Sequence, residues 1–494
     1  MKNIPSIFLL WALSLFLATQ ASAKNIDIGK GSGSLVINAM GGSLDIAEGD
    51  TLTIATGTYS EATFVHLKNV TIVPAEGGVI MKGAISIGDD TNVTFDGTVL
   101  SGEKYPYGFV FSGPSFAFTP ATNLSPRVVG NTQNVTIKGI LCQNNAGLIN
   151  GANVGLVYDG TPATALYYNL AADTVKLTGA AVVYLGTYAQ INAFQDVNIG
   201  MTLKNFIVVN DGTGAVQKVN GRGIYNMVAD HWVITGPTKT WTGDMGVFYV
   251  EGNCTLKNIY RNGGWGWLMR IFNCSLYTPS TSYVYNCIDV NTVSYGTIET
   301  RVTADFSKSI PLVGNDMKIY NVTSGNKGNV TKWTSNLCIG LGNSDHATPT
   351  PHIYETDIVN CLAFNNTTLD HNSLYEDASD GPKIMVKSNN VTIEGPLPDG
   401  YLADTEKFYP ANNKDNPLIG KGKVVPETAT DIYGNPRGDS YDIGAVQHRE
   451  DSAAQEPDKA DAFLGHADLS TNLPSTTPPD TSTNSTSAPT TNTP

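Results

Sequence analysis

The sequence predicts an all-β solenoid, in which one chain winds into coils of short parallel strands. One observation is the tripeptide Asn-Val-Thr, which recurs and is followed by an apolar residue at Asn69, Asn92, Asn134 and Asn390. Each such copy is typical of a strand that an Asn opens at a turn, with Val inward and Thr outward. The second observation is composition: only 15% of residues are charged and 50 are glycine, which favours strands and turns. Strands that return every twenty-odd residues bury their apolar faces by stacking on one another.

The N-terminus has the pattern of a secretory signal. Lys2 supplies a positive start, residues 7–18 form an apolar run, and Ala21-Ser22-Ala23 fits the small-residue cleavage pattern. We therefore expect residues 1–23 to be a signal peptide and the mature chain to be exported, either secreted or held at the cell surface. Since no later run is long and apolar enough to span a bilayer, no membrane insertion is expected.

The charge balance bears on partners. The formal net charge is −14, and no cluster of Lys and Arg is present. Because contacts to phosphates require clustered basic side chains, nucleic acid is not an expected partner. We expect a monomer.

After the signal, the first coil carries a family resemblance. Gly49-Asp50-Thr51 opens an alternating strand that leads into Gly57-Thr58-Tyr59. This stretch resembles the opening of pectate-lyase-like (pectin-lyase-like) proteins, which are single-stranded right-handed parallel β-helices. The resemblance implies coils of three short strands with side chains stacked in ladders inside. The absence of a strict hexapeptide repeat also argues against a left-handed solenoid.

The predicted β-helix spans residues 24–448 and carries loop insertions. Residues 101–127 are rich in Pro, Ser, Phe and Tyr, which indicates a loop. Residues 155–194 fit either an inserted hairpin or irregular coils. From Met201 to Tyr320, short apolar runs separated by Asn, Gly and Asp are typical of buried parallel strands.

The end of the body carries a second resemblance. Asp431-Ile432-Tyr433-Gly434-Asn435-Pro436-Arg437 and Asp442-Ile443-Gly444-Ala445 resemble the closing segment of exported bacterial β-helix proteins. We expect this segment to cover the open C-terminal end, with Arg437 paired to Asp431 or Asp442. Residues 449–494 are first acidic and then almost entirely Ser, Thr, Pro and Asn, so we expect a disordered tail.

Six cysteines leave two alternatives open. An exported chain can form disulfides. Several of these cysteines, however, follow a turn-like Asn, where a small apolar side chain points inward and stacks as a buried thiol. No CxxC or HxxxH spacing is present, so no metal site is predicted from these residues.

Candidate chemistry gathers between residues 222 and 270. Four of the six tryptophans lie there, and sugar rings stack on aromatic faces. The alternation around Trp232 predicts a core position for that residue. The candidate substrate-binding residues are therefore Trp241, Trp265 and Trp267, and the candidate catalytic residues are Arg222, Asp244, Glu251, Arg261 and Arg270.

These residues suit two reactions on a polysaccharide. Elimination needs a base and a cation beside the uronate carboxylate, either an Arg or Ca²⁺, and hydrolysis needs two carboxylates. The Arg-x-Pro-x-x-Arg motif of pectate lyases and the motifs of polygalacturonases are absent, although Asp230-His231 resembles an Asp-His of pectate lyases. The leading hypothesis is a protein that binds and cleaves an extracellular polysaccharide, with Ca²⁺ as an open question. The alternative is a non-catalytic adhesin-like scaffold on a Ser/Thr/Pro-rich stalk.

Overall fold

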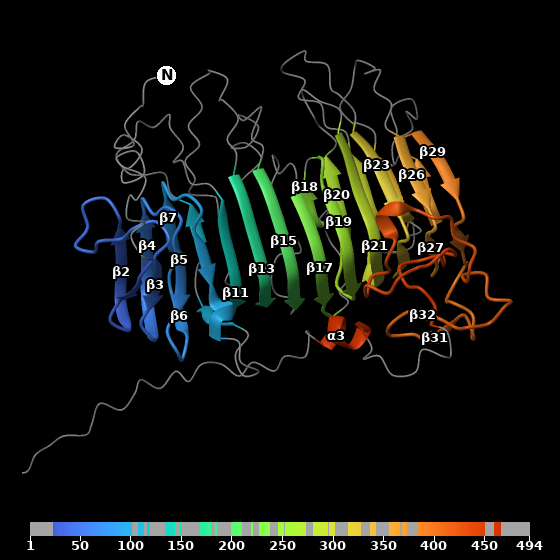
Figure 1. Cartoon of the computed structure of the whole chain (residues 1–494). Coiled ribbons are helices and arrows are strands. Elements are labelled where there is room, and N and C mark those ends of the chain that lie inside the picture. Colours follow the sequence, from blue (N-terminus) through green and yellow to red (C-terminus); the bar gives the residue numbers. More distant parts are fainter. Residues whose placement is uncertain are drawn as a thin grey trace, which may run out of the picture.

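The chain forms stacked coils of parallel strands, as the computed structural model in Figure 1 shows. Among the described residues, one parallel assembly contains 30 strands, and β31 (Leu402–Asp404) pairs antiparallel with β32 (Tyr409–Pro410). The predicted all-β parallel architecture is thus confirmed. The structure describes residues 23–100, 107–112, 116–118, 134–143, 149–150, 168–178, 183–184, 199–209, 219–220, 227–237, 246–250, 252–272, 280–294, 296–301, 315–327, 336–341, 355–365, 368–372, 383–449 and 459–465.

The parallel pairings fall into three series, which we call the first, second and third ladders. The first ladder contains the strands that face the viewer in Figure 1. Its members are β1 (Asn25–Ile28), β3 (Thr51–Ile54), β5 (Thr71–Pro74), β8 (Thr94–Asp96), the first parts of β11 (Val135–Cys142), β13 (Tyr168–Thr178), β15 (Ile199–Val209), β17 (Met227–Thr235), β19 (Thr255–Asn262) and β21 (Ser280–Val293), and then β23 (Asn315–Tyr320), β26 (Glu355–Val359) and β29 (Lys383–Ser388).

The second ladder uses the later parts of the long strands from β11 to β21, because each of these strands bends once. It also contains the first parts of β2 (Ser32–Asn38) and β4 (Gly57–Val65), together with β6 (Val79–Met81), β9 (Phe109–Phe111), β24 (Thr323–Lys327), β27 (Leu362–Ala363) and β30 (Val391–Thr392).

The third ladder completes each coil. It starts with the later parts of β2 and β4 and continues through β7 (Ile85–Gly88), β10 (Phe116–Phe118), β12 (Ile149–Asn150), β14 (Val183–Tyr184), β16 (Val219–Asn220), β18 (Gly246–Val250), β20 (Trp267–Phe272), β22 (Gly296–Arg301), β25 (Asn336–Leu341) and β28 (Thr368–Asn372). The undecided segment 155–194 contributes β13 and β14, which continue the first and third ladders.

The strands form because apolar and polar residues alternate along them. In β3 the side chains of Leu52 and Ile54 are buried and those of Thr51 and Thr53 are half-buried. Successive coils place such residues above one another, so the interior is a continuous apolar column. Trp232 confirms the prediction of a core position: it is fully buried, stacks on Phe206 with ring centroids 4.3 Å apart, and donates its Nε1 proton to the Leu203 carbonyl.

Asparagines make the bends between ladders. Asn205, Asn258, Asn286, Asn321 and Asn360 all have a positive φ, a conformation that Asn tolerates better than most residues. They occupy the corner between the first and second ladders in successive coils. His231 occupies this corner in β17, with φ 58.

The closing segment, residues 416–448, lies along this corner. Its backbone contacts the asparagines of several coils: Asn286 donates to the Thr430 carbonyl, Asn321 to the Gly444 carbonyl and Asn360 to the Lys423 carbonyl. The segment therefore runs beside the last coils as a lateral strap, whereas the sequence-based expectation was a cover over the open end.

The tail contains structure that composition did not predict. Helix α3 (Lys459–Gly465) lies within the expected disordered region 449–494, and Ala460 and Phe463 in it are buried. The expected tail therefore contains at least one helix. Of the predicted signal, residues 1–23, all but Ala23 lies outside the described residues. Among the described helices, none combines the length and apolar character needed to cross a bilayer. A short 3-10 turn, η1 (Gly97–Leu100), follows β8, and η3 (Pro426–Thr428) lies in the closing segment.

The described part of the chain resolves the cysteine alternative in favour of thiols for Cys142, Cys254, Cys287 and Cys361. All four are buried, and Cys287 and Cys361 point their sulfurs at backbone carbonyls of their own coils. Burial raises the pKa of the Cys361 thiol to about 12, which keeps it protonated.

Candidate functional site

Register pairing along the first ladder brings acidic and basic residues into one alternating column. Pairing places one residue of the column in each of six successive coils, and no register shift interrupts it. Adjacent strands are ~4.8 Å apart, so the column is ~24 Å long. Its members, which we call the acid–base column, are Asp96, Lys138, Asp173, Lys204, Asp230 and Lys257.

Lysine ammonium groups are the more accessible members of this column. Lys138 Nζ lies 2.6 Å from Asp96 Oδ2, and Lys257 Nζ lies 3.3 Å from Asp230 Oδ2. In these pairs the lysine side chains are 33% and 30% exposed, against 13% and 10% for the carboxylates. Lys204 is also exposed. A ligand that approaches this face therefore meets ammonium groups first.

A second column of register positions lies beside the first, two residues earlier in each strand. It contains Thr94, Thr136, Ala171, Thr202, Val228 and Thr255. Each of the three lysine coils carries threonine here. The coils of Asp173 and Asp230 carry Ala171 and Val228 instead. The face thus repeats every two coils from β11 to β19, with a Thr-x-Lys coil followed by an apolar-x-Asp coil.

Tyrosines follow both columns at their C-terminal end. Tyr283 is in register with Thr255, and Tyr285 is in register with Lys257. Both side chains are partly exposed. Burial, followed by the nearby Asp230 charge, raises the pKa of Tyr285 to about 12, so its phenol is a hydrogen-bond donor at neutral pH.

The corner beside Asp230 is the most polar part of the face. His231 Nδ1 lies 2.6 Å from Asp230 Oδ1, and Asn258 donates to the same oxygen at 2.7 Å. Burial opposes ionisation of Asp230, but these hydrogen bonds and the charges of His231 and Lys257 outweigh it and hold the pKa of Asp230 below its usual value. The carboxylate therefore stays ionised and orients the imidazole of His231.

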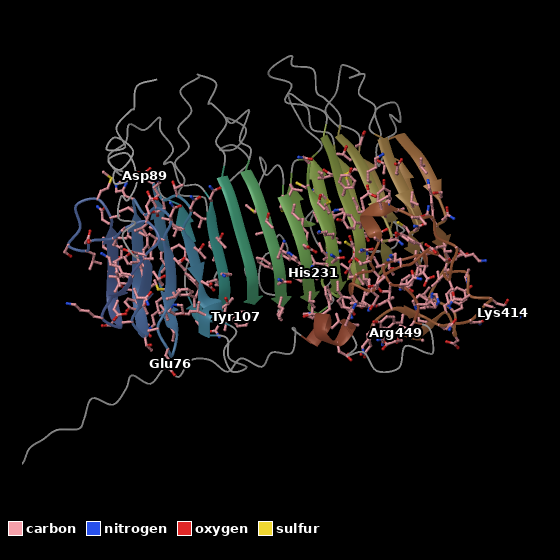
Figure 2. All side chains as sticks on the ribbon, viewed as in Figure 1. Glu76, Asp89, Tyr107, His231, Lys414 and Arg449 are labelled. Atoms are coloured by element: carbon pink, nitrogen blue, oxygen red, sulfur yellow. The ribbon has the colours of Figure 1, made fainter. Side chains whose placement is uncertain are left out.

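Helix α3 lies against this corner. The Phe463 ring is 5.8 Å from the His231 ring and 5.5 Å from the ring of Tyr433 in the closing segment, and Lys407 pairs with Asp461 at 2.6 Å. Figure 2 labels His231 at the lower end of the first ladder, where α3 lies in Figure 1. The side chain of His231 remains 43% exposed.

Half of the site residues predicted from the sequence lie outside the described residues. These are Arg222, Trp241, Asp244 and Glu251. The structure places the other four.

Two of these four, Arg261 and Trp267, contact each other inside the coil. Arg261 is 1% exposed, and its Nε and Nη2 donate to the two carboxylate oxygens of Asp289 at 2.6 and 2.8 Å. Its Nη1 donates to the carbonyl of Trp267, whose side chain is also buried. Since this guanidinium is enclosed and ion-paired, its position suits a structural residue and not a base. Trp267 likewise offers no open face for sugar stacking.

Of the remaining two, Trp265 lies between β19 and β20, and Arg270 lies within β20. Trp265 is half-buried beside the Gly263-Gly264 turn, and its backbone forms an isolated parallel β-bridge with Val293. Arg270 is 2% exposed and is in register with Tyr249 and Glu299 on the third ladder. Arg261 and Trp267 are thus in contact inside the coil, while Arg270 belongs to a different ladder from the acid–base column. Within the described ranges, no group of three His, Cys, Asp or Glu is arranged to hold a metal ion.

Sequence reasoning missed the acid–base column because insertions of different length separate its members. One local signal marks them: most are followed directly by the corner residue of positive φ, as at Gly139, Asn205, His231 and Asn258. Alignment of the coils on that corner would have brought the acids and bases into one column.

Comparisons with known proteins leave the site to be interpreted from its geometry. No protein-family model matches the chain, and no curated protein is significantly similar to it.

Proposed function

We propose that this chain is an exported right-handed parallel β-helix protein that binds an extracellular polysaccharide along the outer face of the first ladder. The observation that carries the proposal is the ~24 Å line of regularly spaced ammonium groups, carboxylates and hydroxyls, which ends at two partly exposed tyrosines. A straight, regular row of polar groups suits a linear polymer better than a compact ligand. Hydroxyls and charged groups bind sugar hydroxyls and carboxylates, and tyrosine rings stack on sugars.

The right-handed winding rests on two supports. The first is the pectate-lyase-like resemblance of the opening coil and the closing segment. The second is general: crossover connections between parallel strands are right-handed in nearly all proteins, because the twist of the strands favours that hand. Export rests on the signal-like pattern of residues 1–23.

Cleavage of the polymer is a second candidate function, and one observation favours it. His231 is oriented by a carboxylate, as imidazoles that act as general bases are, and it is partly exposed. In an elimination, Nε2 of His231 would take the proton from the carbon beside a uronate carboxylate, with Lys257 close to that carboxylate. A carbon–carbon double bond would form as the neighbouring glycosidic C–O bond breaks, and the departing sugar hydroxyl would take a proton from the imidazolium or from water. If no such reaction occurs, the same face supports the adhesin-like scaffold.

Affinity electrophoresis tests the binding proposal. The mature chain would be run through gels that contain acidic, neutral or basic polysaccharides, with serum albumin as the unretarded reference. We expect retardation by at least one acidic polymer, and weaker retardation of Tyr285→Ala because stacking is lost. Normal mobility in every gel would contradict the proposal.

The same polymers test cleavage in a separate assay. Elimination creates an unsaturated sugar that absorbs in the ultraviolet, so the absorbance would rise with time. We expect His231→Gln to abolish that rise while retaining binding. A lack of product on every bound polymer would leave binding without catalysis.

A further inference from the structure

The two-coil period of the outer face points to a specific class of polymer. We infer that the first ladder selects a linear polysaccharide with one anionic group per disaccharide, in which charged and uncharged sugars alternate. This inference rests on the proposed function and deepens it. It also distinguishes this chain from a binder of homopolymeric uronates, in which every sugar is charged.

Spacing is the first support. Lysines recur every second coil, at Lys138, Lys204 and Lys257, so ammonium groups repeat every ~9.6 Å along the face. One sugar of an extended polysaccharide advances by roughly the length of one coil. A disaccharide therefore spans two coils, and one carboxylate or sulfate per disaccharide meets one lysine.

Intervening carboxylates are the second support. A polymer with an anion on every sugar would place alternate anions at the acidic positions of the column, as beside the carboxylate of Asp230, where like charges repel. A neutral or N-acetylated amino sugar avoids this repulsion, and its hydroxyl or amide N–H groups are donors to a carboxylate. The acids therefore act against homopolyuronates, while the more exposed lysines favour an anionic ligand.

The neighbouring column supports the period independently. Thr136, Thr202 and Thr255 accompany the lysines, and Ala171 and Val228 accompany the acids of the coils between them. Cross-strand ion pairing accounts for alternating Asp and Lys, but it does not require hydroxyl and apolar residues to alternate beside them. From β11 to β19, a ligand whose successive units differ in polarity accounts for both columns.

A binding comparison tests the inference on the full mature chain. The probes are hyaluronan, which alternates a uronate with an N-acetylated amino sugar, polygalacturonate, which is charged on every sugar, and dextran, which is neutral. Dissociation constants per unit length would be measured by isothermal titration calorimetry at two salt concentrations. We expect hyaluronan to bind at least ~10-fold more tightly than polygalacturonate, and added salt to weaken its binding.

Two sets of variants make the test specific. We expect the triple variant Lys138→Gln, Lys204→Gln and Lys257→Gln to lose at least ~10-fold in hyaluronan affinity, because three charge-assisted contacts are removed. The matched control, Lys30→Gln, Lys82→Gln and Lys414→Gln, changes the net charge equally at exposed positions outside the column and should bind as the parent does. Asp96→Asn with Asp173→Asn should raise polygalacturonate affinity several-fold, because repulsion is removed.

The possible failures are distinguishable. Polygalacturonate binding that equals or exceeds hyaluronan binding would overturn the inference and leave polysaccharide binding intact. Equal losses in the column and control triples would also overturn it, because net charge alone would then govern binding. If no acidic polymer binds, the proposed function itself fails. Circular dichroism of each variant would show that its fold is retained.

Discussion

At the scale of single residues, the interior of the coils changes character at Arg261. The stacked interior positions Val208 and Ile234 are apolar, and the next two are Arg261 and Asp289. Asn326 and Thr292 also donate to Asp289, so the buried carboxylate accepts hydrogen bonds on both oxygens. Because two opposite charges share this enclosed space, the desolvation of each is offset by the other and by the surrounding donors.

Substitution of Asp289 should remove the compensation between the two buried charges. We expect Asp289→Ala to lower the free energy of unfolding by about 3–5 kcal/mol, because a buried guanidinium is left without its counter-ion. The double variant Arg261→Met with Asp289→Leu should recover much of the loss. The free energy of unfolding of each variant would be measured by denaturant titration, followed by tryptophan fluorescence because Trp267 contacts Arg261. The control is Lys138→Gln, which breaks a surface ion pair and should lower the free energy of unfolding by only about 0–1 kcal/mol. A loss that small for Asp289→Ala would contradict the expectation.

At the scale of elements, asparagine side chains tie successive coils together. Asn134 Nδ2 donates to Asn92 Oδ1 at 2.8 Å, Asn92 Nδ2 to Asn69 Oδ1 at 2.7 Å, and Asn69 Nδ2 to Glu48 Oε2 at 2.7 Å. All three asparagines have a positive φ. The Asn-Val-Thr pattern therefore has a structural use that does not require a glycan: the amide nitrogen that a glycan would modify is a donor in the ladder.

Substitutions of Asn92 separate the two contributions of this ladder. Asn92→Gly removes the side-chain hydrogen bonds but tolerates the left-handed backbone, whereas Asn92→Ala removes the bonds and strains the backbone by a further ~1–2 kcal/mol. We therefore expect the order parent, Gly variant, Ala variant in decreasing thermal stability, measured by calorimetry. An Ala variant as stable as the Gly variant would show that the backbone conformation is not under strain.

At the scale of the whole molecule, the closing segment and α3 join distant parts of the chain. Arg437 is 2% exposed, and its Nη2 donates to Asn286 Oδ1, to the Gly444 carbonyl and to the Ala445 carbonyl. The predicted partners Asp431 and Asp442 act through their charge at longer range. Burial lowers the pKa of Arg437 to about 10, and these two acids oppose the shift, so the guanidinium remains charged at neutral pH. The Arg437 guanidinium thus links the closing segment to Asn286 at the corner between the first and second ladders.

Loss of that cation should detach the strap before the coils unfold. We expect Arg437→Met to make residues 416–448 sensitive to limited proteolysis, because carbonyls and Asn286 lose a buried donor. Arg449→Met, which removes a cation 5.1 Å from the Tyr409 ring, is the control and should leave the strap protected. The cut sites would be mapped by mass spectrometry. Cleavage that begins within the coils of the Arg437 variant would contradict a separate, detachable strap.

The degree to which these features could be predicted depends on whether their signal is local. The alternation of Leu52 and Ile54 with threonines specifies a half-buried strand within a few residues, so the parallel all-β architecture and the core position of Trp232 followed from the sequence. The pairing of Arg261 with Asp289 did not, because the two residues are a full coil apart. The same limit applied to the cysteines, since local sequence cannot place two sulfurs in space. Helix α3 was missed because composition dominated the expectation for the tail.

By itself, the sequence determined that strands form, that asparagines turn them and that they must stack, because strand and turn preferences act over a few neighbouring residues. Only the tertiary structure decided which residues meet across coils. Pairing in register brought Asp96, Lys138, Lys204 and Lys257 into one line despite insertions of different length, and it enclosed Arg261 and Trp267. The physical reason is that coil stacking aligns backbone hydrogen bonds regardless of how much chain intervenes between the coils.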